Sequence, residues 1–164
     1  MPGPPGPAGP ADHMIEAGET STIDEVFQRA VHAYGDRPFL AVPAGGHRAY
    51  HPQGYEIDYA SAERAVSALC DAYRALGYGH GHRVAMLLDN RPEHFLHKLA
   101  LNALGVSCVP VNPDYRAGEI AYLLDSSKAD IAIVSPDRHD QLMAGRSAAV
   151  HKPPVALFVL LMLA

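Results

Sequence analysis

The chain has 164 residues, of which 48% are hydrophobic, and a formal net charge of -5. This length allows one domain with a hydrophobic core, and the composition argues against a chain that is disordered throughout. The acidic balance, without a Lys/Arg cluster, argues against nucleic acid as the main partner. The two cysteines, Cys70 and Cys108, indicate neither a disulfide framework nor a zinc site, so we expect a reducing, cytoplasmic compartment.

The two ends differ in composition from the middle of the chain. Residues 1–20 are rich in proline and glycine and carry no Lys or Arg, which predicts a flexible leader and not a secretory signal. Residues 155–164 are all apolar, but a membrane span needs about 20 such residues, so no span is expected. We expect an ordered region over 21–142 and a divergent apolar tail over 143–164. The tail has no turn, cap or charge to end on, which indicates truncation of a longer protein.

The first ordered element is a helix that begins at Thr22. Thr22 and Glu25 have the spacing of a capping box. One apolar stripe of this helix contains Ile23, Val26, Phe27, Ala30 and Val31. A short strand from Phe39, a Pro/Gly-rich loop and an alternating strand over 55–59 follow. A second helix is expected from Ser61 to Leu76, with Leu76 on its buried face.

From residue 84 onward the pattern alternates between strands and helices. Strands are predicted over 84–88, 106–111 and 131–134, and helices over 92–104 and 117–126. Residues 153–158 have the pattern of the next strand of the sheet. Short links between them imply a parallel sheet with right-handed crossovers, and hence an α/β fold. Asn90 is expected to cap the first of these helices. The helix over 92–104 should bury Leu96, Leu99, Ala103 and Leu104.

The spacing of the glycines in "GYGHG", residues 77–81, is similar to the start of a dinucleotide-binding loop, but the neighbouring elements are in the reverse order. Such a loop leaves a strand and opens a helix, so that the pyrophosphate meets the helix N-terminus. Here the glycines leave a helix and enter a strand. We therefore interpret the segment as a helix stop followed by a tight turn.

No other segment presents a clear active site. His80 with His82, and His94 with His97, are pairs that ten histidines produce by chance, and the second pair shares its expected solvated face with Lys98. Cys108 is expected to be a small core residue. Asp114 is interpreted as a turn former and Glu119 as a helix N-terminal charge. We assign no catalytic, cofactor-binding or metal-ligating residue.

Three segments of the sequence resemble the N-terminal part of the AMP-forming acyl-CoA synthetases, which belong to the adenylate-forming superfamily of AMP-binding enzymes. Ile57, Asp58 and Tyr59 are similar to a strand that ends in tyrosine before a helix. The second segment is "ALGYGHGHRVAMLLDN" and the third is "LNALGVSCVPVNPDYRAGEIAYLL". The resemblance covers about residues 22–135. It departs from the family at His82, where aspartate is usual, and at Leu104, where alanine is usual.

The resemblance implies an incomplete acyl-CoA synthetase-like fold and, for the full-length enzyme, an acid–thiol ligase in fatty acid metabolism. Such an enzyme uses ATP, Mg²⁺ and CoA to turn a carboxylic acid into an acyl-adenylate and then a thioester. The family's phosphate loop, adenylation lysine and C-terminal domain have no counterpart here, because Lys98, Lys128 and Lys152 lie in no matching motif. We therefore expect this chain alone to be inactive.

Two alternatives remain open at this point. One is a stand-alone, non-catalytic interaction or regulatory module derived from the same domain. The other is an unrelated nucleotide-binding α/β domain, which should carry a glycine loop after a strand. The sequence names neither the acid nor the oligomeric state.

Overall fold

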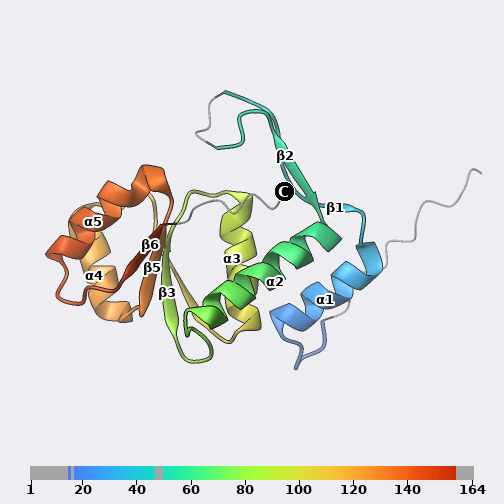
Figure 1. Cartoon of the computed structure of the whole chain (residues 1–164), viewed down its shortest axis with the longest axis horizontal. Coiled ribbons are helices and arrows are strands. Elements are labelled where there is room, and N and C mark those ends of the chain that lie inside the picture. Colours follow the sequence, from blue (N-terminus) through green and yellow to red (C-terminus); the bar gives the residue numbers. More distant parts are fainter. Residues whose placement is uncertain (1–14, 16, 47–49, 158–164) are drawn as a thin grey trace, which may run out of the picture.

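A computed structural model describes residues 15, 17–46 and 50–157 of the chain. Two sheets and the helices around them make up this part (Figure 1). In chain order the elements are α1 (Ile23–Tyr34), β1 (Pro38–Val42), β2 (Tyr55–Asp58), α2 (Tyr59–Ala75), β3 (Arg83–Leu87), α3 (Pro92–Ala103), β4 (Ser107–Pro110), α4 (Ala117–Ser127), β5 (Ile131–Val134), a 3₁₀ turn η1 (Pro136–Arg138), α5 (His139–Ala148) and β6 (Val155–Leu157).

The main sheet has four parallel strands in the order β4-β3-β5-β6. Val84 of β3 pairs with Cys108 of β4 on one side and with Ile131 of β5 on the other. The three strands predicted from the sequence therefore lie in one parallel sheet, which confirms the α/β fold class. Pro110 is the last residue of β4, an edge strand, where a missing N–H costs no ladder bond.

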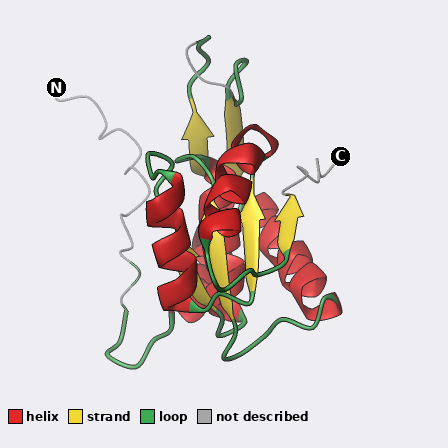
Figure 2. Ribbon diagram, turned by 90° about the vertical axis from the view of Figure 1, so that its left-hand side faces the viewer, coloured by secondary structure: helices red, strands yellow, loops and turns green. Residues whose placement is uncertain are grey.

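Helices cover both faces of this sheet, as the turned view in Figure 2 shows. On one face α2 and α3 enclose a core with inward side chains of β3 and β5, and α1 packs outside them. On the other face α4 and α5 enclose a second core. Both faces of the central strands are buried, which is why β3 and β5 are nearly continuous runs of apolar residues.

The antiparallel pair of β1 and β2 forms a separate sheet beside these layers. Tyr59, which was predicted to end a strand, instead begins α2, because Asp58 caps the helix by accepting from the backbone N–H of Ser61 at 2.6 Å. Hydrogen bonds from the side chain and backbone of Ser61 lower the Asp58 pKa. Leu76 is 65% exposed and not buried, since α2 ends one residue before it and the chain turns away at Gly77.

The capping box of α1 is present as predicted, with Thr22 and Glu25 bonded reciprocally. Its apolar stripe is only partly confirmed. Phe27 is buried, whereas Ile23 is 57% exposed. Ile23 is exposed because α1 is the outermost helix and has neighbours on one side only (Figure 1).

Helix α3 begins after Arg91, with Pro92 in its first turn, so Asn90 is not its cap. Leu96 and Leu99 are buried as predicted. Ala103 and Leu104 are only partly buried, because the helix ends there and the chain leaves the core at the exposed Gly105.

After β5 the α/β alternation continues. Helix α5 was not anticipated from the sequence. The further strand expected over 153–158 is present as β6, in which Val155 pairs in parallel with Ala132 of β5. The end of the predicted apolar tail, residues 158–164, lies outside the described residues, as do residues 1–14 and 16 of the predicted leader. None of the described helices is long and apolar enough to cross a membrane.

Candidate functional site

The carboxyl ends of β3, β4 and β5 meet at one edge of the main sheet, at the top in Figure 1. The chain leaves β3 through α3 on one face, and it passes from β4 to β5 through α4 on the other face. Strand order therefore reverses beside β3. Open parallel sheets bind ligands in the crevice outside the carboxyl ends at such a switch point. This edge is the candidate site.

A cavity of about 350 Å³ lies between the segments that follow β3 and β4. Its walls combine apolar side chains with two carboxamides and one imidazole. The lining residues are Leu88, Asn90, His94, Pro110, Val111, Asn112, Pro113 and Tyr115. An apolar pocket with a few converging polar groups is the usual form of a small-molecule site.

His94, in the first turn of α3, is the titratable group of this cavity. Burial, helped by the Lys98 ammonium, lowers the His94 pKa, so the ring is neutral at pH 7. The Asp89 carbonyl accepts a hydrogen bond from this side chain. Nε2 is buried and has no hydrogen-bond partner among the described residues. In the neutral ring whose Nδ1 donates to that carbonyl, Nε2 is an acceptor.

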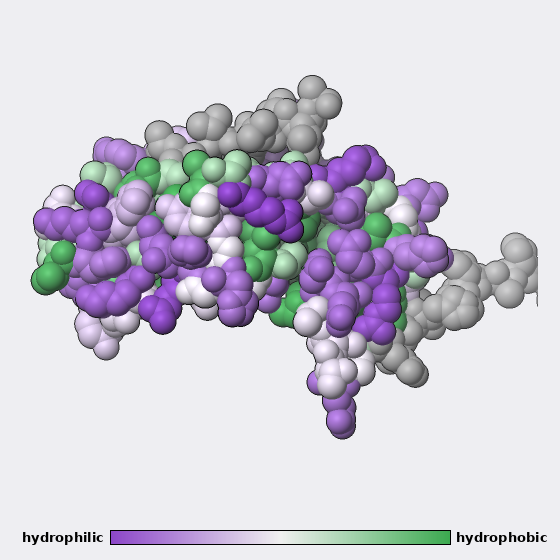
Figure 3. All heavy atoms as spheres, turned by 60° about the horizontal axis from the view of Figure 1, so that its bottom comes forward, coloured by the Kyte–Doolittle hydropathy of each residue, from purple (hydrophilic) through white to green (hydrophobic). Residues whose placement is uncertain are grey.

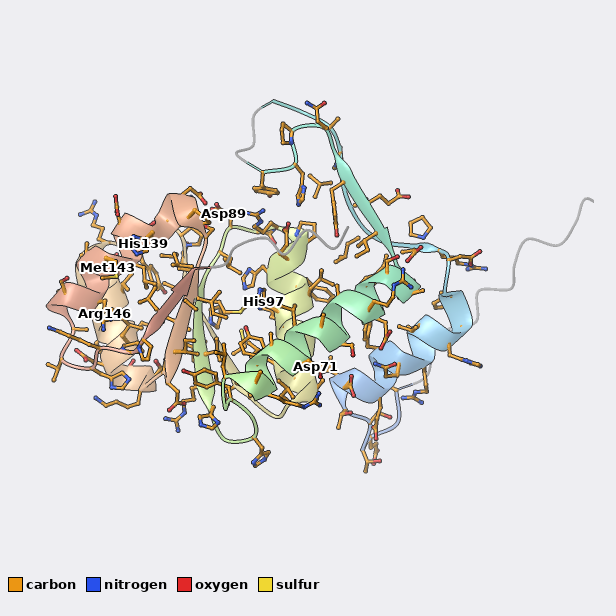
Figure 4. All side chains as sticks on the ribbon, viewed as in Figure 1. Asp71, Asp89, His97, His139, Met143 and Arg146 are labelled. Atoms are coloured by element: carbon orange, nitrogen blue, oxygen red, sulfur yellow. The ribbon has the colours of Figure 1, made fainter. Side chains whose placement is uncertain are left out.

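The prediction that His94 and His97 share a solvated face is wrong. His97, labelled in Figure 4, is only 3% exposed. It lies between α3 and α2, where its Nδ1 is 2.8 Å from the Tyr73 hydroxyl. Burial lowers the His97 pKa to about 4 and raises that of Tyr73. The face is buried because α2 packs across it, a contact that the sequence of α3 alone does not reveal.

An ion pair joins the segments after β3 and β5 across the switch point. The Arg138 guanidinium donates to Asp89 Oδ1 at 2.8 Å (Asp89 is labelled in Figure 4). Gln141 extends the link, since its amide donates to the carbonyls of Pro113 and Tyr115 at 2.7 and 2.8 Å. The side chains of Asp89, Arg138 and Gln141 thus join the segments that follow β3, β4 and β5.

Ser135, the residue directly after β5, is fully buried at this edge. Its hydroxyl has no hydrogen-bond partner among the described residues. Its backbone N–H donates to the Leu87 carbonyl at 3.3 Å, which continues the ladder between β5 and β3 by one residue.

The other residues singled out from the sequence lie elsewhere or have structural roles. His80 and His82 belong to the turn at the opposite edge of the sheet, between α2 and β3, which confirms a helix stop and turn there. The Asp114 N–H donates to the Asn112 side chain in a turn, and Glu119 accepts from the Arg116 N–H at the start of α4. Cys108 is half-buried and packs on the core, as predicted.

Sequence reasoning missed Asp89, Arg138 and Gln141, which hold the edge together. A usable signal was present, because Asp89 and Arg138 each follow a predicted buried strand. No group of three or more His, Cys, Asp or Glu side chains within the described ranges is arranged to hold a metal ion.

Comparison with known proteins decides the family. The model of the family described as "AMP-binding enzyme" matches residues 27–161, which is most of the chain. The chain belongs to the AMP-binding enzyme family. The resemblance noted in the sequence is thereby confirmed, and the match includes α5 and β6.

Curated relatives of this AMP-binding enzyme chain include two bacterial ligases. A crotonobetaine/carnitine–CoA ligase from Citrobacter koseri is 30% identical over 82 residues, which are 50% of this chain and 16% of the relative. A ligase of the same name from Salmonella paratyphi A is 30% identical over 80 residues, 49% of this chain and 16% of the relative. The matching part of the chain therefore covers only about a sixth of these relatives.

Two solved structures share the fold. One is named a long-chain-fatty-acid CoA ligase from Rhodopseudomonas palustris, with a TM-score of 0.72, 20% identity, and coverage of 86% of this chain and 33% of the other. The second is the N-terminal domain of FACL13 from Mycobacterium tuberculosis, with a TM-score of 0.73, 19% identity, and coverage of 85% and 34%. The sheet and its flanking helices match the N-terminal domain of adenylate-forming ligases.

Proposed function

We propose that this chain forms the N-terminal part of an ATP-dependent acid–thiol ligase. In that reaction a carboxylate attacks the α-phosphate of ATP, and an acyl-adenylate and pyrophosphate are formed. The thiol of CoA then attacks the acyl carbon and AMP leaves, which yields the thioester. The observation that carries the proposal is the family match over residues 27–161, together with relatives that are named CoA ligases.

The contribution of this chain is to position the edge at which the reactants meet. Asp89, Arg138 and Gln141 hold the three loops of the carboxyl edge in one arrangement. Preorganised groups lower a barrier only if their support is rigid, so a braced edge suits this role. Among the described residues, no group of three or more His, Cys, Asp or Glu side chains is placed to hold Mg²⁺.

We further propose that the 164 residues do not activate an acid by themselves. The sequence contains no G-x-x-x-x-G-K-[ST] loop, and its only threonines are Thr20 and Thr22, which precede or begin the first helix. A phosphate-binding loop rich in Ser, Thr and Gly is therefore absent from the sequence. Catalysis needs these groups from the remainder of a ligase.

The two free cysteines, Cys70 and Cys108, support a reducing, cytoplasmic setting for this ligase. The names of the relatives, which concern carnitine and long-chain fatty acids, support a role in fatty acid metabolism.

ATP–pyrophosphate exchange with a panel of carboxylic acids tests the proposed lack of activity. We expect no exchange above a heat-denatured control at saturating ATP and Mg²⁺. Exchange that is lost on substituting His94 or Arg138 would show that the active site lies within this chain, and the proposal would be wrong. If the remainder of a ligase also fails to restore activity, the chain is better described as a stand-alone interaction or regulatory module.

A further inference from the structure

One buried carboxylate fastens the loop between β1 and β2 to the start of α3. Glu93 is 7% exposed, with Oε1 2.7 Å from His51 Nε2 and Oε2 accepting from Arg91 Nε at 2.9 Å. The side chains of His51 and Arg91 are themselves only 14% and 11% exposed. We call these three residues the clasp. Buried charges persist only when they are paired, so the clasp is stable only as a unit.

Two tyrosines enclose the clasp. The Tyr50 hydroxyl donates to the Asn90 carbonyl at 2.7 Å, and the Arg91 guanidinium lies 5.0 Å from the centre of the Tyr50 ring. The ring of Tyr55, the first residue of β2, stacks on His51 with centroids 4.4 Å apart. These rings exclude water from the charges, which strengthens their attraction.

The backbone at His51 shows that these contacts hold the loop in a strained form. His51 has a φ of +46°, a left-handed conformation that is uncommon outside glycine, although histidine, asparagine and aspartate adopt it more often than other residues. Its carbonyl accepts from the Gly54 N–H at 2.9 Å in the turn that leads to β2. Such a conformation persists only when surrounding contacts fix it. The strain favours release once the clasp is broken.

The clasp adjoins the cavity of the carboxyl edge. Asn90 and His94, which line that cavity, flank Arg91 and Glu93 in the chain. The loop that carries His51 is not part of the main sheet, because β1 and β2 pair only with each other among the described strands. The loop projects on the carboxyl-edge side of the molecule in Figure 1.

We propose that the clasp is a conformational release point, at which residues 50–54 detach from α3 and loosen the cavity rim while the four-stranded sheet stays folded. No strand pairing of the main sheet depends on the clasp, and the base of β1 and β2 is packed independently on α2 and α3. The opening is therefore local. Local openings of this kind have lower free energies than global unfolding.

The charges around Glu93 set the direction of its pH response. The ionisable groups near it are Arg91, His51, Tyr55 and His97. Burial raises the pKa of Glu93, but hydrogen bonds from Arg91, from its own backbone and from His51 outweigh burial and hold the pKa below its ordinary value. A lowered carboxyl pKa stabilises the closed form above the ordinary pKa and loses that effect as the pH falls through the lowered one. The Glu93 charge thus stabilises the closed clasp at neutral pH, and this contribution is lost in acid.

Hydrogen–deuterium exchange on the full chain tests the proposal at pH 7. In Glu93→Gln we expect the peptides over residues 50–56 and 89–95 to exchange about tenfold faster than in the wild type. Peptides of β3 and β5 should change less than about twofold. Asp71→Asn is the matched control, because the Asp71–Arg74 pair is exposed and touches neither loop nor cavity.

His51→Asn removes the contact between His51 and Glu93 while the Glu93 carboxylate stays in place. This second variant tests the proposal even if Glu93→Gln unfolds the protein. Asparagine tolerates the left-handed backbone but is too short to reach Glu93. It should speed exchange in the same two peptides only. Unchanged exchange over residues 50–56 in His51→Asn, or an equal rise in β3 and β5 peptides, would overturn the proposal.

Discussion

Gly145 of α5 lies directly against the side chain of Ile120 of α4, so that a Cβ added to this glycine would overlap the Ile120 Cβ and Cγ2 atoms. The two helices approach this closely over one face of the sheet (Figure 1). Gly145→Ala must push the helices apart or force Ile120 from its rotamer. We expect it to lower the free energy of unfolding by about 2–3 kcal/mol, measured by urea denaturation.

Gly118→Ala, in α4, is the control for that prediction. A Cβ there meets nothing within 4 Å. Alanine should therefore stabilise the helix by about 0.5–1 kcal/mol, since glycine is a poor helix former. If Gly145→Ala proved as harmless as Gly118→Ala, the close packing of α4 on α5 would be incorrect.

The buried His97 predicts how stability depends on pH. Its pKa is lowered to about 4 by burial, whereas an unfolded histidine titrates near 6.5. The unfolded chain binds this proton first as the pH falls, so stability is complete above about 6.5 and declines toward pH 4. The decline from this residue should be about 3 kcal/mol. Denaturation midpoints measured from pH 7.5 to 4.5 give the slope.

His97→Leu is the variant that isolates this contribution. It should flatten the decline in stability between pH 6.5 and 4.5, although the Tyr73 hydroxyl then loses its partner and overall stability falls. The double variant His97→Leu with Tyr73→Phe replaces the lost hydrogen bond by an apolar contact. A pH slope in that double variant equal to the wild-type slope would mean that His97 is not buried in the neutral form.

Much of this fold could be predicted from the sequence, because the core strands obey simple rules. Buried runs such as residues 131–134 and the capping box at Thr22 act through neighbours close in the chain. His97 is buried instead by α2, a helix some 20 residues earlier in the chain. Helix α5 is held in place by its contact with α4. The site was harder to predict because Asp89 and Arg138 are 49 residues apart and meet only when β3 and β5 pair.

Gly105 and Gly77 form a second matched pair of substitutions. Both have positive φ, +65° and +84°, but only at Gly105 would a Cβ meet a neighbour, the His80 ring at 2.8 Å. Gly77→Ala should cost about 1 kcal/mol of stability from backbone strain alone. Gly105→Ala should cost about 1 kcal/mol more. Combining Gly105→Ala with His80→Ala should remove the excess in thermal unfolding, and a persistent excess would mean that His80 is not the obstacle.

The Asp89–Arg138 pair should make a measurable contribution to the rigidity of the carboxyl edge. The side chains are 21% and 34% exposed, so solvent screens them only in part. A double-mutant cycle with Asp89→Asn and Arg138→Gln should give a coupling energy of about 1 kcal/mol in urea denaturation. The coupling should shrink at 1 M salt, and a value near zero at low salt would show that the bridge does not brace the edge.

A chimera shows whether this chain serves as the N-terminal part of an acid–thiol ligase. Residues 21–157 would replace the matching segment of the Citrobacter koseri crotonobetaine/carnitine–CoA ligase, and the Salmonella paratyphi A segment would be exchanged at the same junctions as a control. The measurement is ATP–pyrophosphate exchange with carnitine. We predict exchange in both chimeras. A folded chimera of this chain that shows no exchange, beside an active control, would mean that the chain does not serve as this part of a ligase.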